Sequence, residues 1–177
     1  PAGGGGAPAG RVRVAGACGA AAPARGGRRA RGGEYVRVLS AQARAGSSLP
    51  FAVELDDELV GQLTVSSITY GSLCGASIGY WVSEHVAGRG VIPTAVAMAT
   101  DYCFTILGLH RIEINIRPEN GPSLRVVEKL GLRDEGVRER YLHIQGEWRD
   151  HRTFAVTSEE VPDGILARWQ APRLERL

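Results

Sequence analysis

A glycine-rich loop in front of an expected helix is the part of this sequence whose residue types and spacing point most directly to chemistry. The loop, Ala-Gly-Arg-Gly-Val-Ile-Pro, occupies Ala87–Pro93 and precedes the helix predicted over Thr94–Leu107. Gly88 and Gly90 allow the backbone to turn several N–H groups toward one point, and the first turn of a helix adds unpaired N–H groups and the positive end of its dipole. Because such a structure binds anions, and Arg89 adds a positive charge, the pattern predicts a site for a pyrophosphate.

The same loop also has a plainer explanation. It lacks the GxxxxGK[ST] pattern of a P-loop, and its GxGxxG pattern is incomplete, so two glycines are equally explained by an ordinary turn. Three further features favour the anion site, of which one is that the second predicted helix ends in Glu-Lys-Leu-Gly-Leu at Glu128–Leu132. An apolar segment ending in Trp81-Val82 precedes the loop, and the segment Arg-Pro-Glu-Asn-Gly-Pro-Ser at Arg117–Ser123 joins a later strand to another helix.

The elements that position these segments follow from hydrophobic periodicity. Alternation of Ile112, Ile114 and Ile116 with polar residues predicts a half-buried strand, and Pro93 and Gly108 fit the first turn and the end of the preceding helix. The order of elements predicts an α+β fold with a mixed sheet. The predicted strands are Phe51–Leu55, Leu59–Thr69, Ala76–Val82, Arg111–Arg117, Arg138–Ile144 and Arg152–Val156, with a further short strand at Arg11–Val14. The predicted helices are Glu34–Ala45, Thr94–Leu107 and Asn120–Leu130, followed by a short helix or irregular segment in Ser158–Leu177.

The composition divides the 177 residues into two parts of opposite charge. Residues 1–33 carry six arginines and no acidic residue, whereas residues 34–177 carry a net charge of −4, which gives +2 for the whole chain. Residues 1–33 are rich in Gly and Ala and poor in large apolar side chains, so we expect a poorly ordered segment in front of a single domain at 34–177. A nucleic-acid-binding arm is the alternative, but without aromatic residues base stacking has no support, and direct nucleic-acid binding is not expected.

Several classes of protein are not expected from this composition. There is no run of about 18 apolar residues that could cross a membrane, and no secretory signal is recognised at the N-terminus. The three cysteines, Cys18, Cys74 and Cys103, form no CxxC pair, and the histidines are dispersed, so neither a disulfide framework nor a metal site is expected. Cys103 is expected in a helix core. These features predict a cytoplasmic protein without a bound metal.

A series of motifs, taken in order, resembles the GNAT superfamily of acetyl-CoA-dependent N-acetyltransferases, and within it the ribosomal-protein-alanine N-acetyltransferase (Rim-type) branch. The resemblance covers residues 51–157 and implies a mixed, mostly antiparallel central sheet flanked by helices. The motifs that carry it are IGYWV at Ile78–Val82, GRGV at Gly88–Val91, HRIEINIRPEN at His110–Asn120, SLRVVEKLGL at Ser123–Leu132 and RYLHIQGEWRDH at Arg140–His151.

The resemblance implies acetyl-CoA as the co-substrate. The family's loop pattern is Q/R-x-x-G-x-G/A, in which Gly90 matches, whereas Ala87 and Ile92 depart from it. Backbone N–H groups of the loop would hold the pyrophosphate, the end of the preceding strand would pair with the pantetheine arm, and a basic residue of the second helix would reach a phosphate. The residues assigned to cofactor binding in this way are Trp81, Val82, Gly88, Arg89, Gly90, Val91, Ile92, Thr94, Asn120, Ser123 and Arg125.

The resemblance also implies direct attack of an amine on the thioester. Ser123 would protonate the leaving thiolate, and a backbone N–H such as that of Val82 would stabilise the oxyanion. The general base stays open: Glu139 and Glu113 are the candidates, and Asn115 would orient a water or the substrate. An N-terminal amine has a pKa near 8, so a modest base or a water relay is sufficient.

The acceptor implied by the branch is the N-terminal α-amine of a ribosomal protein. A small amine or an antibiotic is the first alternative, and a non-catalytic module that binds acyl-CoA is the second. In the family the N-terminal part shapes the acceptor site, and the composition of residues 1–33 departs from it. We expect a monomer or a homodimer.

Overall fold

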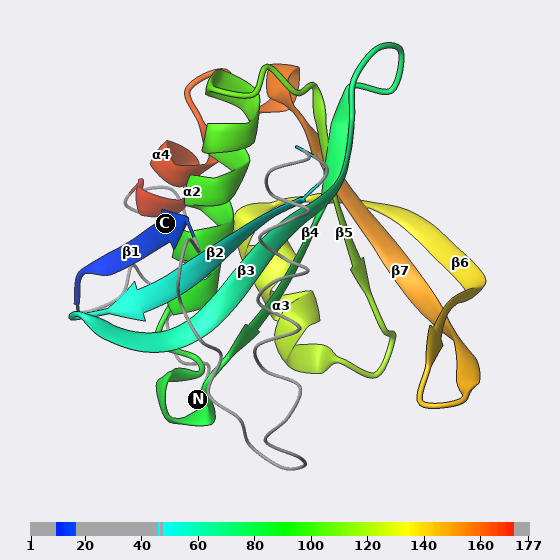
Figure 1. Ribbon diagram of the computed structural model, residues 1–177, viewed down its shortest axis with the longest axis horizontal. Helices are drawn as coiled ribbons and strands as arrows, with labels where there is room; N and C mark the ends of the chain where they lie inside the picture. The colour runs from blue at the N-terminus through cyan, green and yellow to red at the C-terminus, as the bar shows by residue number, and fades with distance from the viewer. Residues whose placement is uncertain (1–9, 17–45, 47, 172–177) are drawn as a thin grey trace, which may run out of the picture.

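The fold is built on a mixed sheet with helices packed against it (Figure 1). The computed structural model describes residues 10–16, 46 and 48–171. Within them, a seven-stranded sheet has the order β1-β2-β3-β4-β5-β7-β6. The strands are β1 Val12–Gly16, β2 Ser48–Leu55, β3 Glu58–Thr69, β4 Gly75–Val82, β5 Arg111–Ile116, β6 Arg133–Ile144 and β7 Glu147–Thr157. The helices are α2 Val91–Thr105, α3 Gly121–Leu130 and α4 Ile165–Gln170, with 3-10 turns at Glu84–Val86 and Ser158–Glu160.

The sheet confirms the expected α+β class with mostly antiparallel pairing. Only β4 and β5 run parallel among the described strands, and every other neighbouring pair is antiparallel. The short strand expected at Arg11–Val14 corresponds to β1, which pairs with β2. The helix predicted over Glu34–Ala45 lies outside the described residues. None of the described helices has the length and hydropathy that a membrane crossing requires.

The start of one helix and the lengths of two strands differ from the sequence prediction. Helix α2 begins at Val91 rather than Thr94, because Gly90 acts as its N-cap in a left-handed conformation (φ 80°) and Pro93 is tolerated in its first turn. Strands β6 and β7 are longer than predicted. Asp134 and Gly136 have low strand propensity, so their segment resembled a loop, but Asp134 pairs with β7 and the pairing resumes at Val137 after an irregularity.

The core lies between the sheet and the helices. The side chains of Ile112, Ile114 and Ile116 are buried on one face of β5, as their alternation predicted. Helix α2 is buried on most of its surface, and Cys103, on that helix, has no exposed area; burial raises the pKa of its thiol to about 12. Helices α2, α3 and α4 contact one another, so they form one layer on the same face of the sheet.

Strands β4 and β5 separate before they end, and this split positions the site. Their parallel pairing joins Gly75–Ser77 to Arg111–Glu113 only, yet β4 continues to Val82 and β5 to Ile116. Figure 1 shows the two strands diverging toward their carboxyl ends. Because α2 follows β4 and α3 follows β5, both helices begin near the open end of the split.

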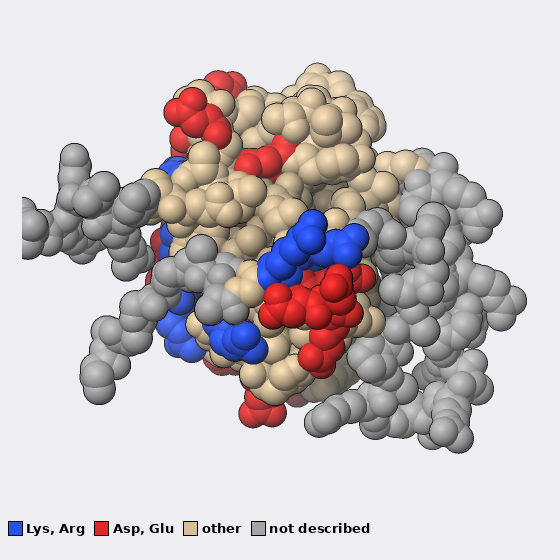
Figure 2. Space-filling view, turned by 90° about the vertical axis from the view of Figure 1, so that its left-hand side faces the viewer, with Lys and Arg blue, Asp and Glu red and all other residues tan. Residues whose placement is uncertain are grey.

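The β1 edge of the sheet carries charges of both signs. Arg13 on β1 lies 3.1 Å from Asp57 and 4.0 Å from Glu54. Figure 2 shows that blue and red side chains lie next to one another on this face rather than forming a surface of one sign. Exposed pairs of this kind contribute little to stability, so the charge of this edge indicates no particular ligand.

Candidate active site

A cavity of about 370 Å³ lies at the open end of the split between β4 and β5. Its walls are the end of β4, the glycine-rich loop with the first turn of α2, and one side of α3. The lining residues are Tyr80, Val82, Val86, Ala87, Gly88, Gly90, Val91, Ile92, Pro93, Pro122, Ser123, Arg125, Val126 and Lys129. Two segments that the sequence analysis singled out separately, Ala87–Pro93 and the start of the second helix, therefore form a single site.

The glycine-rich loop presents free backbone donors to this cavity. Gly88 and Gly90 adopt positive φ angles of 81° and 80°, which a residue with a side chain rarely adopts. Since α2 begins at Val91, the N–H groups of Val91 and Ile92 have no acceptor within the helix. A Cβ at Gly88 would meet no atom within 4 Å, so the space above the loop is open. The loop therefore fits an anionic group, as predicted.

Two residues of the predicted phosphate loop have other partners. The N–H of Thr94 donates to the Gly90 carbonyl at 3.2 Å, and the Thr94 hydroxyl donates to the same oxygen at 2.9 Å. Thr94 is also buried and does not line the cavity, so its N–H and hydroxyl are both used within the chain, and cofactor binding by Thr94 stays a prediction. The N–H of Arg89 points to the Val86 carbonyl at 3.4 Å, and its exposed side chain does not line the cavity.

The edge of β4 supplies a backbone donor. The N–H of Ser83 donates to the Val60 carbonyl of β3 at 2.7 Å. Because alternate residues of a strand direct their N–H groups to the same edge, the N–H of Val82 lies on the opposite edge, which faces the split. The Trp81 side chain points to the face opposite Tyr80 and Val82 and does not line the cavity. The N–H of Trp81, two residues before Ser83, lies on the edge that faces β3. That Trp81 binds a cofactor arm therefore stays a prediction.

The first turn of α3 forms the opposite wall. The side chain of Asn120 caps the helix, and its Oδ1 accepts a hydrogen bond from the Ser123 N–H at 3.2 Å. Ser123 lines the cavity, and its carbonyl accepts a hydrogen bond from the Tyr80 hydroxyl at 3.5 Å, across the split. Burial raises the pKa of Tyr80 to about 12, so this hydroxyl stays a neutral donor. That Asn120 also bonds a cofactor arm stays a prediction.

Positive charge enters the cavity from α3. Arg125 was expected there, and Lys129, one helical turn further along, was missed by the sequence analysis. The spacing of four residues places both side chains on the same face of the helix, a relation that the sequence shows once the helix is assigned. Neither side chain forms an ion pair with any residue in the described part of the chain.

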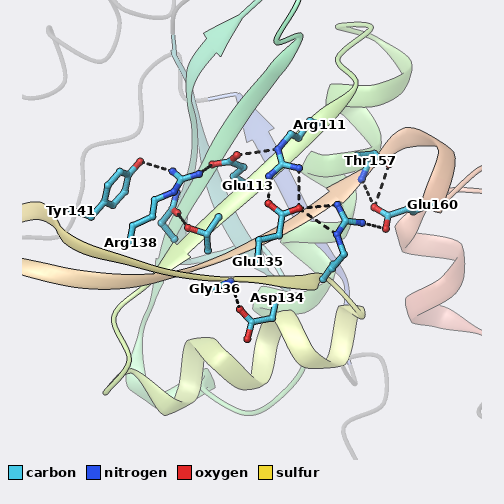
Figure 3. A network of polar contacts seen from close by, with 12 residues as sticks. Arg111, Glu113, Asp134, Glu135, Gly136, Arg138, Tyr141, Thr157 and Glu160 are labelled. Carbon is cyan, nitrogen blue, oxygen red and sulfur yellow. Dashed lines mark hydrogen bonds and ion pairs between the residues drawn. The ribbon is translucent and has the colours of Figure 1, made fainter.

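The candidate base Glu113 lies in a network of charged groups instead (Figure 3). Its Oε1 accepts from Arg111 at 3.0 Å and its Oε2 from Arg138 at 3.0 Å. Arg138 also donates to the Tyr141 hydroxyl at 3.1 Å. Both carboxylate oxygens are thus held by guanidinium groups, and Glu113 does not line the cavity.

The other two candidates also lie outside the cavity. Glu139 is on β6 with its side chain 75% exposed and only a 4.0 Å contact with Arg140. Asn115 accepts a hydrogen bond from the Thr153 hydroxyl of β7 at 2.8 Å. In the structure Ser123 alone, of the four predicted catalytic residues, lines the cavity.

The family assignment follows from the fold, the site and a sequence comparison. The mixed, mostly antiparallel sheet flanked by helices is the fold that the motif series implied, and the split between β4 and β5 is a feature that the structure adds. The family described as acetyltransferase (GNAT) domain matches residues 26–133, more than half of the chain. The chain belongs to the GNAT acetyltransferase family. The expectation of a GNAT-type fold is confirmed, and acetyltransferases that use acetyl-CoA are the class to which this family belongs.

The chain is similar to three individual acetyltransferases or probable acetyltransferases. The structure of Mycobacterium smegmatis RimJ in complex with CoA-disulfide is 44% identical, has a TM-score of 0.76, and covers 84% of this chain and 74% of that one. A probable N-acetyltransferase YjcK of Bacillus subtilis is 38% identical over 59% of this chain and 58% of its own length. The ribosomal protein uS5-alanine N-acetyltransferase of Escherichia coli is 31% identical over 62% of this chain and 56% of its own length. The chain thus spans a little over half of the two curated relatives.

Proposed function

We propose that this chain transfers an acetyl group from acetyl-CoA to the N-terminal α-amine of a ribosomal protein. The observation that carries the proposal is the cavity at the split of β4 and β5, where free loop N–H groups and two cationic side chains face the same space. Similarity to RimJ and to the uS5-alanine enzyme supports the acceptor class, whereas the name of YjcK specifies no acceptor.

The residues present fit the co-substrate. The N–H groups of Val91 and Ile92 would hold the pyrophosphate, and Arg125 and Lys129 provide positive charge for its phosphates. The free edge of β4 would pair with the amide-containing arm. When bound, acetyl-CoA supplies the thioester carbonyl that the amine attacks.

Two groups of the chain would then act on the reaction. The Val82 N–H would donate to the oxygen that becomes negative when the amine adds to the carbonyl. After the C–N bond has formed, the Ser123 hydroxyl, on the opposite wall, would give its proton to the departing thiolate as the C–S bond breaks, and would take up a proton from water in return. The amine loses its own proton to water or to a base, and with a pKa near 8 a fraction of it is already neutral at pH 7.

A second hollow suggests where the acceptor enters. It measures about 240 Å³ and is lined by Pro118, Glu119, Trp148, Arg149 and Asp150, between the loop that leads into α3 and the β6–β7 hairpin. An aromatic ring and carboxylates suit a cationic amine. Both carboxylates also have contacts within the chain: Glu119 lies 3.4 Å from Arg117, and Asp150 accepts from the Arg140 N–H at 2.7 Å.

The test is an acceptor panel analysed by mass spectrometry. Peptides with the N-terminal sequences of ribosomal proteins, matched peptides with acetylated N-termini and a set of polyamines and aminoglycosides are incubated with acetyl-CoA. The proposal predicts one acetyl group on the α-amine of a free peptide and none on the blocked controls. Acetylation of small amines alone would contradict the acceptor assignment, and binding of acetyl-CoA without turnover on any acceptor would favour a non-catalytic module.

The acceptor hollow has its own test. Trp148→Ala is expected to raise the KM for the peptide by about tenfold, equal to about 1.4 kcal/mol, with an unchanged KM for acetyl-CoA. An effect on acetyl-CoA instead would place Trp148 on the cofactor side.

A further inference from the structure

The C-terminal helix α4 is fixed to both helices that bound the cavity, although it does not line the cavity itself. The carboxylate of Asp101 on α2 accepts from the N–H groups of Ile165 and Leu166, at 2.7 Å and 3.1 Å. Arg168 on α4 donates to the carbonyls of Leu130 and Gly131, at the end of α3. Any displacement of α4 would therefore be transmitted to both walls of the site.

A chain of three buried polar groups runs from α4 to the glycine-rich loop. The indole N–H of Trp169 donates to the Thr94 hydroxyl at 2.9 Å, and that hydroxyl donates to the Gly90 carbonyl at 2.9 Å. The direction is fixed, because an indole N–H can only donate and the hydroxyl has a single proton. Trp169 and Thr94 are 9% and 5% exposed, so water competes little for these bonds, and bonds arranged in series strengthen one another.

This series of hydrogen bonds fixes the orientation of the Val91 N–H, a hydrogen-bond donor in the cavity. In a trans peptide the carbonyl of one residue and the N–H of the next point in opposite directions. The Gly90 carbonyl is held from the helix side by the hydroxyl and the N–H of Thr94. The Val91 N–H of the same peptide unit must therefore point the other way, and Gly90 and Val91 both line the cavity. Glycine at a positive φ has freedom to rotate this unit, so an external restraint is needed.

We propose that Trp169 and Thr94 are positioning residues for the cofactor: through the Gly90 carbonyl, the C-terminal helix holds the Val91 N–H in the direction that binds the pyrophosphate. The inference rests on the proposed function, since it requires a CoA ligand in the cavity. It assigns to Thr94 a role behind the loop rather than in contact with the phosphate. It also assigns a function to α4, which contributes no lining residue.

The experiment compares two substitutions at Thr94 by calorimetric titration with CoA. Thr94→Val keeps the shape but removes the hydroxyl, and is expected to raise the Kd by about three- to tenfold, the effect of losing one restraining hydrogen bond. Thr94→Ser keeps the hydroxyl and is expected to stay within about twofold of the wild type. In turnover assays Thr94→Val should raise the KM for acetyl-CoA and leave kcat at saturation unchanged, because the reacting groups are elsewhere.

Two further variants keep the test decisive. Trp169→Phe retains an aromatic ring but removes the N–H, and should raise the Kd for CoA in the same direction as Thr94→Val. Ile165→Val, on the same helix and fully buried, should lower the melting temperature without changing the Kd. Thr94→Val and Trp169→Phe with wild-type affinity would overturn the inference, as would an equal loss of affinity in Ile165→Val. Absence of CoA binding by the wild-type protein would instead overturn the proposed function.

Discussion

The cavity between β4 and β5 and the base of the β6–β7 hairpin differ in how their polar groups are paired. Around the cavity, loop N–H groups, the Ser123 hydroxyl and the cations of α3 face open space. Around the base of the β6–β7 hairpin, the charged groups bind one another: Arg111 joins Glu113 and Glu135, and Arg133 joins Glu135 and Glu160. The first arrangement leaves interactions available for a ligand, and the second uses them to hold strands together.

Whether a polar side chain is already paired within the chain distinguishes binding groups from structural groups. Residue type alone does not make this distinction. A glutamate on a strand beside the site looks like a base in the sequence, yet the geometry gives Glu113 two guanidinium partners. No buried side-chain nitrogen or oxygen among the described residues lacks a hydrogen-bond partner. The side-chain groups that remain free to bind a ligand are therefore at the protein surface, and those of the cavity are among them.

Replacement of Gly90 is expected to have the largest effect on ligand binding in the cavity. Gly90→Val places a β-branched side chain at φ 80°, which is strained, in a residue that lines the cavity proposed to bind the pyrophosphate. We expect the affinity for acetyl-CoA to fall by at least about 100-fold, close to 3 kcal/mol, in a calorimetric titration. Gly71→Val is the matched control, because Gly71 has a similar φ of 77° in open space outside the cavity. Equal affinity in the two variants would move the cofactor elsewhere.

Removal of the Ser123 hydroxyl tests the proposed acid. Ser123→Ala should lower kcat by about 10- to 100-fold, at the low end for general acid catalysis because a thiolate is already a good leaving group. The Kd for acetyl-CoA should stay within a factor of two or so, since the binding donors are backbone groups. A kcat equal to that of the wild type would remove Ser123 from the mechanism.

In the charged network at the base of the β6–β7 hairpin, we expect replacement of Glu113 to change stability rather than rate. Glu113→Gln should cost about 1.5–3 kcal/mol of unfolding free energy, the range for hydrogen bonds to charged groups, in a urea titration. Glu139→Gln is the control, because this carboxylate is exposed and its loss should change stability by at most about 0.5 kcal/mol. If either variant lost kcat together with the acidic limb of the pH–rate profile, that residue would be the base.

The smallest expected effect concerns acid stability. Hydrogen bonds from Arg111 and then Arg133 lower the pKa of Glu135 from its ordinary value of 4.5 to about 2. A carboxylate with a lowered folded-state pKa stabilises the fold above its unfolded-state pKa, and this contribution is lost as the pH falls from about 4.5 to 2. Glu135→Gln should thus unfold more readily at pH 7, by about 1 kcal/mol, and show a flatter acid transition. A parallel acid curve for variant and wild type would contradict this account.

Much of the fold was predictable from the sequence because its signals are local. The alternation of Ile112, Ile114 and Ile116 defined β5, and Pro122 and Gly131 bracketed α3. The length of β6 was not predictable, since the strand extends back to Arg133 only because Arg133 and Asp134 pair with β7 on the far side of an irregularity that contains Gly136.

The parts of the site that local backbone structure positions were predictable from the sequence. The loop of Gly88 and Gly90 and the cavity position of Ser123 agree with the structure. The roles of Thr94 and Glu113 depend on partners far away in the sequence, Trp169 and Arg138, and no local pattern reveals such contacts. Tyr80 and Lys129 were missed for the same reason, because the cavity forms only when β4 and α3 come together.

The most direct test of the central claim is a calorimetric titration of the full chain with acetyl-CoA. We expect one saturable site with a Kd in the micromolar range, corresponding to about −8 kcal/mol. No heat of binding up to millimolar acetyl-CoA would contradict it, and would mean that the departures at Ala87 and Ile92 have disabled the loop despite its geometry.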